Sequence, residues 1–415
     1  MDAVTAPAPT TTTGTAGRGL VLIGVAIVLT GLNLRSAVTS VGPVLDEVEQ
    51  GLGISSGAAG VITSLPVLCF ALIGFTGPAL AARFRDSHVL AAALLSMTAG
   101  LLLRALSDSF GVFVVGTVGA MVGGALGNVL LPGLVKRHFP TRVGLLVGAY
   151  STAMTVGGAS AAISTAPVAG SLGADGWRWA LGIWAVPALV AAVGWLAVRA
   201  RPGASRQGHT AVRMRMLFRS RLAWAMVVFF GVQAMEAYIV IGWTAQYLRD
   251  QGMAASTAGL LLGVNSIASI PLNAVVAALT VRQRLQRPML AVFLCCYVAG
   301  FTGLMVAPLT ATVVWMLLLA VAMSTFAMML ALLALRARTP ESTAALSTMT
   351  QSWGYLLAAG GPLLVGVARG ITGGYEGMFA LCLGGVAVLA VAGWVACRER
   401  YVDDELSEPA GRLRD

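Results

Sequence analysis

The chain has 415 residues, of which 57% are hydrophobic and 11% are charged, and its mean hydropathy is +0.84. A soluble protein of this length cannot bury so much apolar surface, so the composition excludes the soluble globular class and makes lipid the expected solvent. The formal net charge of +10 follows from membrane topology, as argued below, and requires no nucleic-acid partner.

Charged and Pro/Gly-rich breaks divide the chain into twelve apolar segments, most of which have the roughly 20 residues needed to span a bilayer. They are expected to be helices, because an open strand edge in lipid leaves backbone groups without hydrogen bonds. We therefore predict an all-α integral membrane protein. The predicted spans are 19–45, 56–82, 88–107, 110–136, 142–170, 177–198, 222–248, 254–280, 288–308, 310–335, 342–369 and 375–397.

An internal repeat divides these helices into two groups of six. "LGISSGAAGVITSL" at 52–65 recurs as "QGMAASTAGLLLGV" at 251–264, which aligns Gly53 with Gly252 and Gly60 with Gly259. Chance similarity between Gly/Ala-rich helices is the alternative. The repeat predicts two pseudo-symmetric six-helix bundles. The predicted parts are a disordered tail (1–18), the first bundle (19–199), a basic linker (200–220), the second bundle (221–398) and a charged tail (399–415).

The basic residues predict the orientation. If both termini are cytoplasmic, 22 of the 27 Lys and Arg residues fall on the cytoplasmic side, as the positive-inside rule requires. Arg104, Arg178, Arg249 and Arg369 fall outside, and Arg35 lies within the membrane. The use of 26 Arg to one Lys favours a GC-rich bacterium, so we expect a bacterial cytoplasmic (inner) membrane.

Arg35 and Glu236 each stand deep inside the first helix of one half. Both lie about 15–17 residues from the cytoplasmic end, near the bilayer midplane. A charge there costs roughly 2.5–3.5 kcal/mol on insertion scales, so it should face a partner or an interior cavity. We predict that Arg35 binds an anionic or polar substrate group and that Glu236 is a proton-coupling site or the counter-charge of Arg35. A buried pair that only fixes packing is the alternative.

Further polar residues stand at similar depth and are predicted to line the cavity or to bond between helices. Gln351 and Tyr355 are four residues apart and share a helix face. The complete set of predicted substrate-binding residues is Asn33, Arg35, Asn128, Tyr150, Gln233, Tyr238, Asn265, Gln351, Trp353 and Tyr355.

Features of other protein classes are missing from the sequence. The three histidines lie in loops or at helix ends, there is no H-E-x-x-H or G-x-S-x-G motif, and the five cysteines lack metal-ligand spacing. "GTVGAMVGGALG" at 116–127 follows no strand and favours helix packing over nucleotide binding. No charged ring or filter loop of an ion channel is found. We expect no enzyme activity, metal or cofactor.

Three blocks resemble the cyanate porter (CynX/NimT) family of the major facilitator superfamily. They are "LNLRSAVTSVGPVLDEV", "GALGNVLLPGLVKRHFPTRVGLLVGAY" and "LRARTPESTAALSTMTQSWGYLLAAGGPLLVG". The similarity covers roughly residues 20 to 397. It implies a carrier of small compounds such as cyanate or 2-nitroimidazole, and a monomer. Asn33, Arg35, Asn128, Tyr150, Gln351 and Tyr355 lie within the matching blocks, whereas Glu236 lies outside them.

Two departures from the superfamily pattern stand beside this resemblance. An alanine occupies the usual aspartate position in "GPALAARFRDSH", and "TAMTVGGAS" lacks the Gly-Pro of many antiporters. The sequence predicts a secondary transporter of a small anionic or strongly polar compound, coupled to protons and working by alternating access. Its expected partners are the small-molecule substrate, protons and the lipid bilayer. A multidrug-type exporter of hydrophobic or cationic compounds is the alternative.

Overall fold

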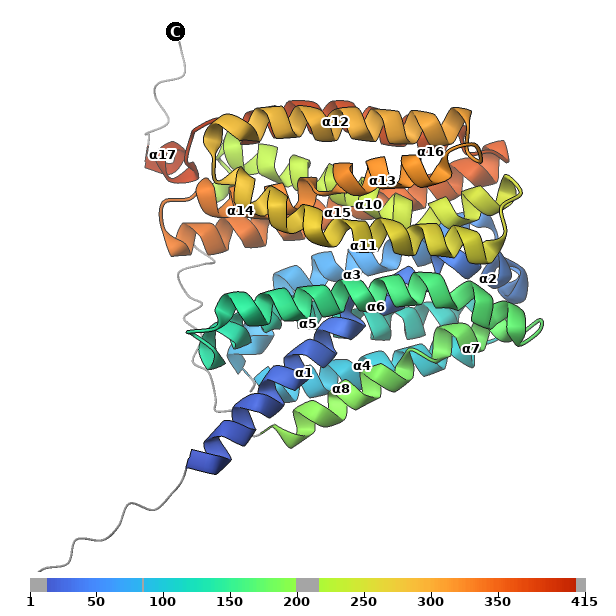
Figure 1. Cartoon of the computed structure of the whole chain (residues 1–415), viewed down its shortest axis with the longest axis horizontal. Coiled ribbons are helices and arrows are strands. Elements are labelled where there is room, and N and C mark those ends of the chain that lie inside the picture. Colours follow the sequence, from blue (N-terminus) through green and yellow to red (C-terminus); the bar gives the residue numbers. More distant parts are fainter. Residues whose placement is uncertain (1–12, 84–85, 199–215, 408–415) are drawn as a thin grey trace, which may run out of the picture.

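The protein is an all-α membrane protein in which two groups of long helices lie side by side. The computed structural model describes residues 13–83, 86–198 and 216–407 (Figure 1). Within these residues, twelve spans are long and apolar enough to cross a membrane. This confirms the predicted all-helical class. In Figure 1 helices α1–α8 form the lower half and helices α10–α16 the upper half.

The helices of the N-terminal half are followed by those of the C-terminal half along the chain. The first half contains α1 (Thr13–Thr39), η1 (Gly42–Val44), α2 (Leu45–Leu52), α3 (Ser56–Arg83), α4 (Asp86–Ala105), α5 (Phe110–His138), α6 (Val143–Ser171), α7 (Gly176–Gly182) and α8 (Ala185–Ala197). The second contains α10 (Arg221–Asp250), α11 (Ala255–Thr280), α12 (Gln283–Val306), α13 (Thr312–Met323), α14 (Thr325–Leu335), α15 (Pro340–Thr372), α16 (Glu376–Ala396) and α17 (Val402–Ser407).

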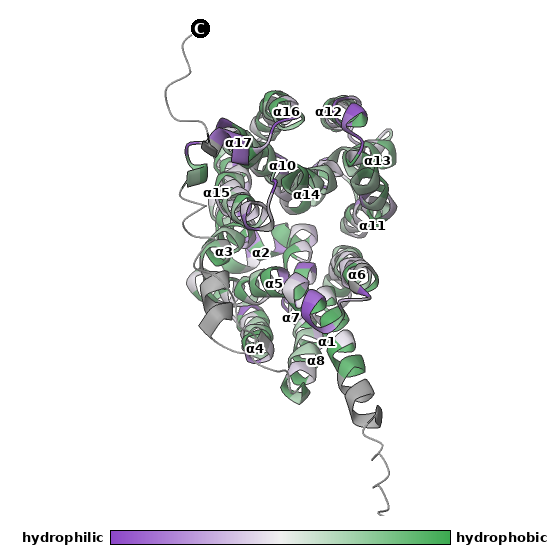
Figure 2. Ribbon diagram, turned by 90° about the vertical axis from the view of Figure 1, so that its left-hand side faces the viewer, coloured by the Kyte–Doolittle hydropathy of each residue, from purple (hydrophilic) through white to green (hydrophobic). Residues whose placement is uncertain are grey.

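Apolar side chains cover the outer as well as the inner faces of these helices. Val115, Val186, Ile371 and Val391 are all more than half exposed. Figure 2 shows the apolar colour along the helices and more polar colour near their ends. A helix that is hydrophobic all round suits a lipid environment, where the outer face meets acyl chains and the inner face meets other helices.

The two halves use equivalent helix contacts. Within the first half α1 packs on α6 and α4 on α5, and within the second α10 packs on α15 and α12 on α13. Between the halves α3 packs on α15, and α6 packs on α11. In the repeat alignment α3 corresponds to α11 and α6 to α15, so the two contacts between halves are related by the same pseudo-symmetry. Two symmetric seams therefore hold the halves together.

Several predicted boundaries are corrected by the structure. Helix α1 begins at Thr13, inside the expected tail, and ends at Thr39, before a turn that contains Pro43. The predicted spans 177–198 and 310–335 are each two helices, broken after Gly182 and at Ser324. Most of the predicted linker lies outside the described residues.

The expected charged tail contains an ordered helix, α17, which contacts the second bundle. Glu405 accepts hydrogen bonds from Ser220 Oγ (2.7 Å) and from the Leu222 backbone (3.2 Å), at the start of α10. Arg338, just before α15, forms a bidentate pair with Asp404 at 2.8 and 2.9 Å. Acidic side chains near helix N-termini are favourable because unpaired N–H groups point toward them.

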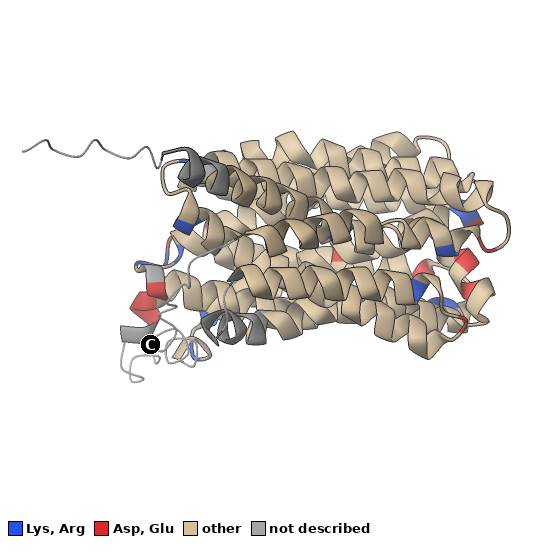
Figure 3. Cartoon of the chain, turned by 90° about the horizontal axis from the view of Figure 1, so that it is seen from below, with Lys and Arg blue, Asp and Glu red and all other residues tan. Residues whose placement is uncertain are grey.

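We call the end of the bundle that carries α17 the terminal end, and the opposite end, which carries α2, the distal end. Charged residues gather at both ends in Figure 3, with few between them. This distribution agrees with a membrane-spanning body whose two ends are in water.

Candidate functional site

A cavity of about 560 Å³ lies between the two halves. Its walls are formed by α1, α3, α5 and α6 from the first half and by α10, α11, α13, α14 and α15 from the second. On α6 and α15 the lining residues lie in the first half of the helix, and on α5 and α11 in the second half. All of these are at the terminal end. The cavity therefore occupies the terminal half of the bundle.

Arg35 is a wall residue of this cavity. Among the described lining residues it alone carries a formal charge. The Cβ of Arg35 lies close to α6, where a Cβ added to Gly158 would be 3.2 Å away, so the glycine leaves room for the arginine. Within the described chain no carboxylate pairs with Arg35 in the ion-pair geometry that other arginines show. Its guanidinium is thus a cation available to an anion in the cavity.

Aromatic rings from both halves form another wall. Phe70 of α3 lies 5.5 Å from Tyr355 of α15 and 6.5 Å from Tyr238 of α10, between ring centroids. Phe230 meets Tyr355 edge to face at 4.9 Å. Arg35, Tyr238 and Tyr355 all line this cavity. Flat apolar faces and a cation therefore share one compartment.

Four of the other predicted residues also line the cavity, namely Asn128, Tyr150, Gln233 and Gln351. The amide of Gln351 donates to Ser347 Oγ at 2.8 Å, which fixes its direction along α15. Gln233 Oε1 is buried and has no donor among the described residues, so the lining contains an unpaired acceptor there.

The structure places Asn33, Asn265 and Trp353 off the lining of this cavity. Asn33 donates to Leu29 O (2.8 Å) and Pro187 O (3.1 Å), and Asn265 donates to Met316 O (2.8 Å). Residues two positions apart on a helix are separated by about 200° around its axis. Asn33 is two positions from Arg35, and Trp353 is two positions from both Gln351 and Tyr355. Each therefore faces away from the side of its helix that lines the cavity.

Glu236 is not on the cavity wall and forms no ion pair with Arg35 in the described chain. It is completely buried on α10, within the C-terminal half, and neither carboxyl oxygen has a hydrogen-bond partner in the described chain. The cavity residues of α10 are 233, 234, 237, 238 and 241, which form a stripe along one face of the helix. Because each residue turns the helix by about 100°, residue 236 is rotated by roughly 130° from the centre of this stripe. The proton-coupling role is compatible with this position.

Asn273 and Phe70 are among the lining residues that the sequence reasoning missed. Asn273 of α11 lines the cavity, with an Oδ1 that has no donor among the described residues. Asn273 could have been found by the criterion that identified Asn265, which is a polar residue within an apolar helix. Phe70 had no such signal, because a phenylalanine in an apolar helix is equally suited to lipid or core.

Arg104, which was expected outside the membrane, is fully buried in the N-terminal half. Its guanidinium donates to Ala37 O at 3.2 Å and to Ser40 Oγ at 3.4 Å. Ala37 belongs to the last turn of α1, where carbonyls lack helical partners, and Ser40 follows the end of the helix. Arg104 therefore stabilises the end of the helix that carries Arg35.

Arginine–carboxylate pairs join the two halves at the distal end. Arg249, at the end of α10, forms a bidentate pair with Glu47 of α2 at 2.7 and 2.8 Å. Arg369, at the end of α15, bonds to Glu49 at 3.1 Å and to Asp250 at 3.0 Å. We call these five residues the distal latch. Because the pairs are mostly shielded from water, they are stronger than exposed surface pairs.

Small residues bring the helices together beneath the latch. A Cβ on Gly366 of α15 would lie 2.7 Å from the Cα of Gly60 of α3, and one on Gly259 of α11 would lie 2.5 Å from Ala162 O of α6. Both seams between the halves are therefore closed at backbone distance in their distal parts. The latch and the seams seal the cavity from the distal end.

The chain is similar to known transporters over most of its length. Residues 21–362 match the Major Facilitator Superfamily model. The chain is 34% identical to the 2-nitroimidazole transporter of Escherichia coli (95% of this chain, 100% of that protein). It is 33% identical to the uncharacterized transporter YycB of Bacillus subtilis (91% and 93%) and 29% identical to the E. coli cyanate transport protein CynX (88% and 95%).

Solved structures share the same fold. A bacterial homolog of the human lysosomal transporter Spinster matches with a TM-score of 0.73 and 17% identity, over 93% of this chain and 97% of that one. The D-xylose-proton symporter matches with a TM-score of 0.70 and 18% identity, over 90% and 97%. The chain belongs to the major facilitator superfamily and, within it, to the group of transporters that includes CynX and the 2-nitroimidazole transporter.

Proposed function

We propose that the protein is a secondary active transporter that moves a small anionic or strongly polar compound across the bacterial cytoplasmic membrane by alternating access, coupled to protons. The observation that carries this proposal is Arg35, a cation without a carboxylate partner in the described chain, on the wall of a cavity of about 560 Å³ between the halves. A cavity of this volume suits a small molecule.

The composition of the wall supports an anion or an electron-rich polar group. No acidic residue is among the described residues that line the cavity, so a cationic drug would find no counter-charge there. The guanidinium of Arg35 offers a planar fork of donors, and Phe70, Tyr238 and Tyr355 offer ring faces beside it. The relatives named for cyanate and 2-nitroimidazole are consistent with this small, flat class of substrate.

Alternating access is supported by the difference between the two ends of the bundle, because one end contains the cavity and the other is closed. The cavity extends through the terminal half, whereas the distal half is closed by the latch and the glycine contacts. We propose that the terminal end, with both chain termini, is cytoplasmic, because the basic residues concentrate there. The structure then represents a form sealed toward the outside, and transport requires the latch to open. The proposed functional unit is a monomer.

Proton coupling is assigned to Glu236. A carboxylate buried without a donor or cation is far less stable than the neutral acid, so this side chain binds a proton in the arrangement described here. A conformation that admits water to the side chain would release it.

A ligand screen on purified protein tests the proposed substrate class. Thermal unfolding is measured with cyanate, 2-nitroimidazole, small aromatic carboxylates and drug-like cations, for wild type and Arg35→Ala. A ligand at a hundredfold excess over Kd stabilises the folded state by about 2.7 kcal/mol. We expect anions to raise the melting temperature of wild type alone. Stabilisation by cations that survives Arg35→Ala would refute the proposal and favour a multidrug exporter.

A further inference from the structure

Basic residues gather where the start of α12 meets the end of α16, at the terminal end of the C-terminal half. The two helices are joined there by a hydrogen bond from Gln283 Nε2 to Cys397 O at 2.7 Å. One turn deeper into the bundle, the guanidinium of Arg287 lies over the Trp394 ring, 4.6 Å from its centroid. Exposed side chains surround this contact, and we call them the α12–α16 patch. They are Arg282, Arg284, Arg287, Trp394, Arg398 and Arg400.

A buried arginine holds the backbone of this contact in place. Arg336, which follows α14, donates to Ala396 O at 2.9 Å and to the side chains of Gln283 (3.1 Å) and Gln286 (2.5 Å). These bonds tie the end of α14 to the end of α16 and to the start of α12. The arginines of the patch are therefore carried by a fixed backbone, and binding of an anion requires little ordering of the helices.

The patch lacks a counter-charge within the described chain. None of its five arginines forms an ion pair there, whereas Arg338, two residues after Arg336, pairs with Asp404 at 2.8 Å. Glu399 belongs to the same segment and forms no ion pair among the described residues either. Glu405 of α17 is bonded to Ser220 at the start of α10. Because like charges held together repel one another, the patch favours an anionic ligand.

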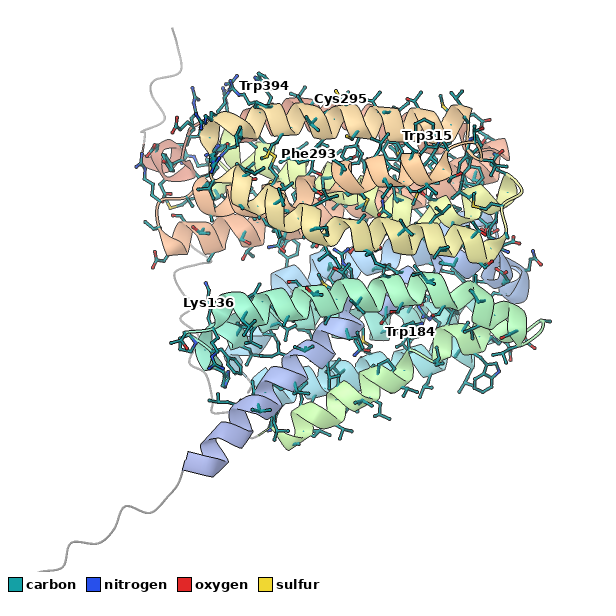
Figure 4. All side chains as sticks on the ribbon, viewed as in Figure 1. Lys136, Trp184, Phe293, Cys295, Trp315 and Trp394 are labelled. Atoms are coloured by element: carbon teal, nitrogen blue, oxygen red, sulfur yellow. The ribbon has the colours of Figure 1, made fainter. Side chains whose placement is uncertain are left out.

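The patch borders the outer, lipid-facing surface of α12 and α16. Val391, one turn before Trp394, is 71% exposed, and Val292 of α12 is more than half exposed. Figure 4 shows Trp394 at the outer edge of the bundle, near the start of α12. A tryptophan between an apolar helix face and a charged helix end is typical of the membrane–water interface. The arginines therefore lie at the level of lipid headgroups and the valines at the level of acyl chains.

Trp394 also has a hydrogen-bond donor that the described chain does not use. The indole N–H groups of Trp224 and Trp243 donate to backbone carbonyls, but that of Trp394 has no such partner among the described residues. Arg287 covers the ring face of Trp394, and the ring is exposed at the surface. An ester or phosphate oxygen of a lipid is an acceptor that suits this donor at the interface.

We propose that the α12–α16 patch binds the headgroup of an anionic phospholipid, with the phosphate against the arginines and the acyl chains along the exposed valines. A lipid is favoured over a soluble anion because the cations adjoin an apolar surface, and a phospholipid matches both parts. The orientation proposed above places this site in the cytoplasmic leaflet. The site lies outside the cavity lining, so the proposal does not depend on the identity of the substrate.

Thermal unfolding of the full chain in a neutral detergent tests the recognition of the headgroup. Dioleoyl phosphatidylglycerol, dioleoyl phosphatidylcholine and glycerol phosphate are titrated into wild type and Arg284→Gln/Arg287→Gln. We expect phosphatidylglycerol to raise the melting temperature of wild type more than the other two compounds do. Loss of two cations at the lipid surface should weaken phosphatidylglycerol binding roughly 30-fold.

The matched control is Arg219→Gln/Arg221→Gln. This variant also removes two exposed arginines at the terminal end of the C-terminal half, but at the start of α10. It has the same net charge as the patch variant and should respond to phosphatidylglycerol as wild type does. The melting temperature of each variant without lipid shows whether the substitutions alter folding.

Brominated acyl chains, which quench tryptophan fluorescence on contact, test where the lipid binds. Nanodiscs of phosphatidylcholine receive an equal small fraction of brominated phosphatidylglycerol or brominated phosphatidylcholine. The difference in fluorescence between wild type and Trp394→Phe reports on Trp394. We expect brominated phosphatidylglycerol to quench this component more strongly. In the Arg284→Gln/Arg287→Gln background the two brominated lipids should quench it equally.

The remaining outcomes overturn the proposal. Equal effects of the two lipids on wild type in both assays would mean apolar contact without recognition of the headgroup. An equal shift with glycerol phosphate would make a soluble anion the ligand. Selectivity that survives Arg284→Gln/Arg287→Gln, or is lost in the control, would place the site elsewhere. A wild-type dimer that Arg284→Gln/Arg287→Gln converts to a monomer would make a second copy of the chain the occupant.

Discussion

Arg35 shows how one side chain depends on the residues around it for its chemistry. Arg104 bonds to the last turn of α1, and Gly158 lets α6 approach the Arg35 backbone. The guanidinium then faces a cavity without a described acidic neighbour. A cation on a helix held in this way binds an anion with little backbone rearrangement, because the position of α1 is fixed before the ligand arrives.

At the residue scale we predict that Arg35→Lys binds the anionic substrate roughly 10- to 100-fold more weakly than wild type, because a point charge replaces a bidentate fork. Titration calorimetry against the anion found in the screen measures the change. Arg219→Lys, an arginine outside the cavity lining, is the control. Equal affinity of Arg35→Lys and wild type would show that only charge matters at this position.

At the scale of elements, the seam between α3 and α15 is closed by glycines. A leucine at Gly366 would place its Cβ 2.5 Å from Ser56 O. Overpacking of this kind costs roughly 1–3 kcal/mol, which the protein avoids if the two helices separate. We predict that Gly366→Leu lowers the melting temperature or shifts the protein toward a state open at the distal end.

The matched control for this seam is Gly384→Leu. A Cβ at Gly384 of α16 meets no atom within 4 Å, so the same change should leave both properties unaltered. Melting temperature and labelling of a cysteine placed in the cavity measure the two effects. A Gly366→Leu protein that matches wild type in both would contradict the close contact of α3 and α15.

Helix α17 gives a second prediction at this scale. The hydrogen bond and charge of Arg338 hold the pKa of Asp404 below its usual range. A lowered pKa contributes stability that is present above the unfolded-state value, about 4, and is lost as pH falls through the folded-state value. The melting temperature of wild type should exceed that of Asp404→Asn slightly at pH 7, and the difference should shrink as the pH falls below about 4. A constant difference between pH 3 and pH 7 would contradict the ion pair.

At the scale of the whole molecule, the distal latch determines which end is closed. We predict that Arg249→Glu, which sets a carboxylate against Asp46 and Glu47, opens the distal end. Labelling of Ser151→Cys, a cavity residue, by an impermeant maleimide added to intact cells measures this. If the substitution destabilises the sealed state by about 1–3 kcal/mol relative to the open state, the population open to the label rises roughly 5- to 150-fold. Cells that express the same protein without Ser151→Cys measure the labelling of the native cysteines, which is subtracted.

Charge exchange and a second arginine provide the controls for the latch. Glu47→Arg combined with Arg249→Glu should restore slow labelling, because the pair is re-formed with opposite polarity. Arg178, also at the distal end, pairs with Asp108 (2.9 Å) and Asp175 (3.2 Å) inside the N-terminal half. Arg178→Glu should therefore leave labelling unchanged. Faster labelling in the control, or no rescue in the double variant, would contradict the latch.

The composition and the internal repeat of the sequence were enough to determine the class of fold without knowledge of any tertiary contact. Twelve apolar segments of membrane-spanning length allow only helices, since lipid offers no hydrogen bonds to the backbone. The same reasoning identified Arg35, because a charge near the midplane is too costly to be incidental. Broken helices such as α13–α14 escaped it, because both parts are equally apolar and the break depends on packing.

The sequence by itself therefore determined the membrane environment, the number of spans and the similar depth of Arg35 and Glu236, because the position of a residue along a spanning helix follows from which segments are apolar. The direction of each side chain around its helix was decided only by the tertiary structure. Arg35 and Glu236 stand at equal depth in the sequence, yet one faces the cavity and the other a pocket inside the C-terminal half. The pairing of Arg249 with Glu47 was equally hidden, because it joins residues about two hundred positions apart through the packing of the two halves.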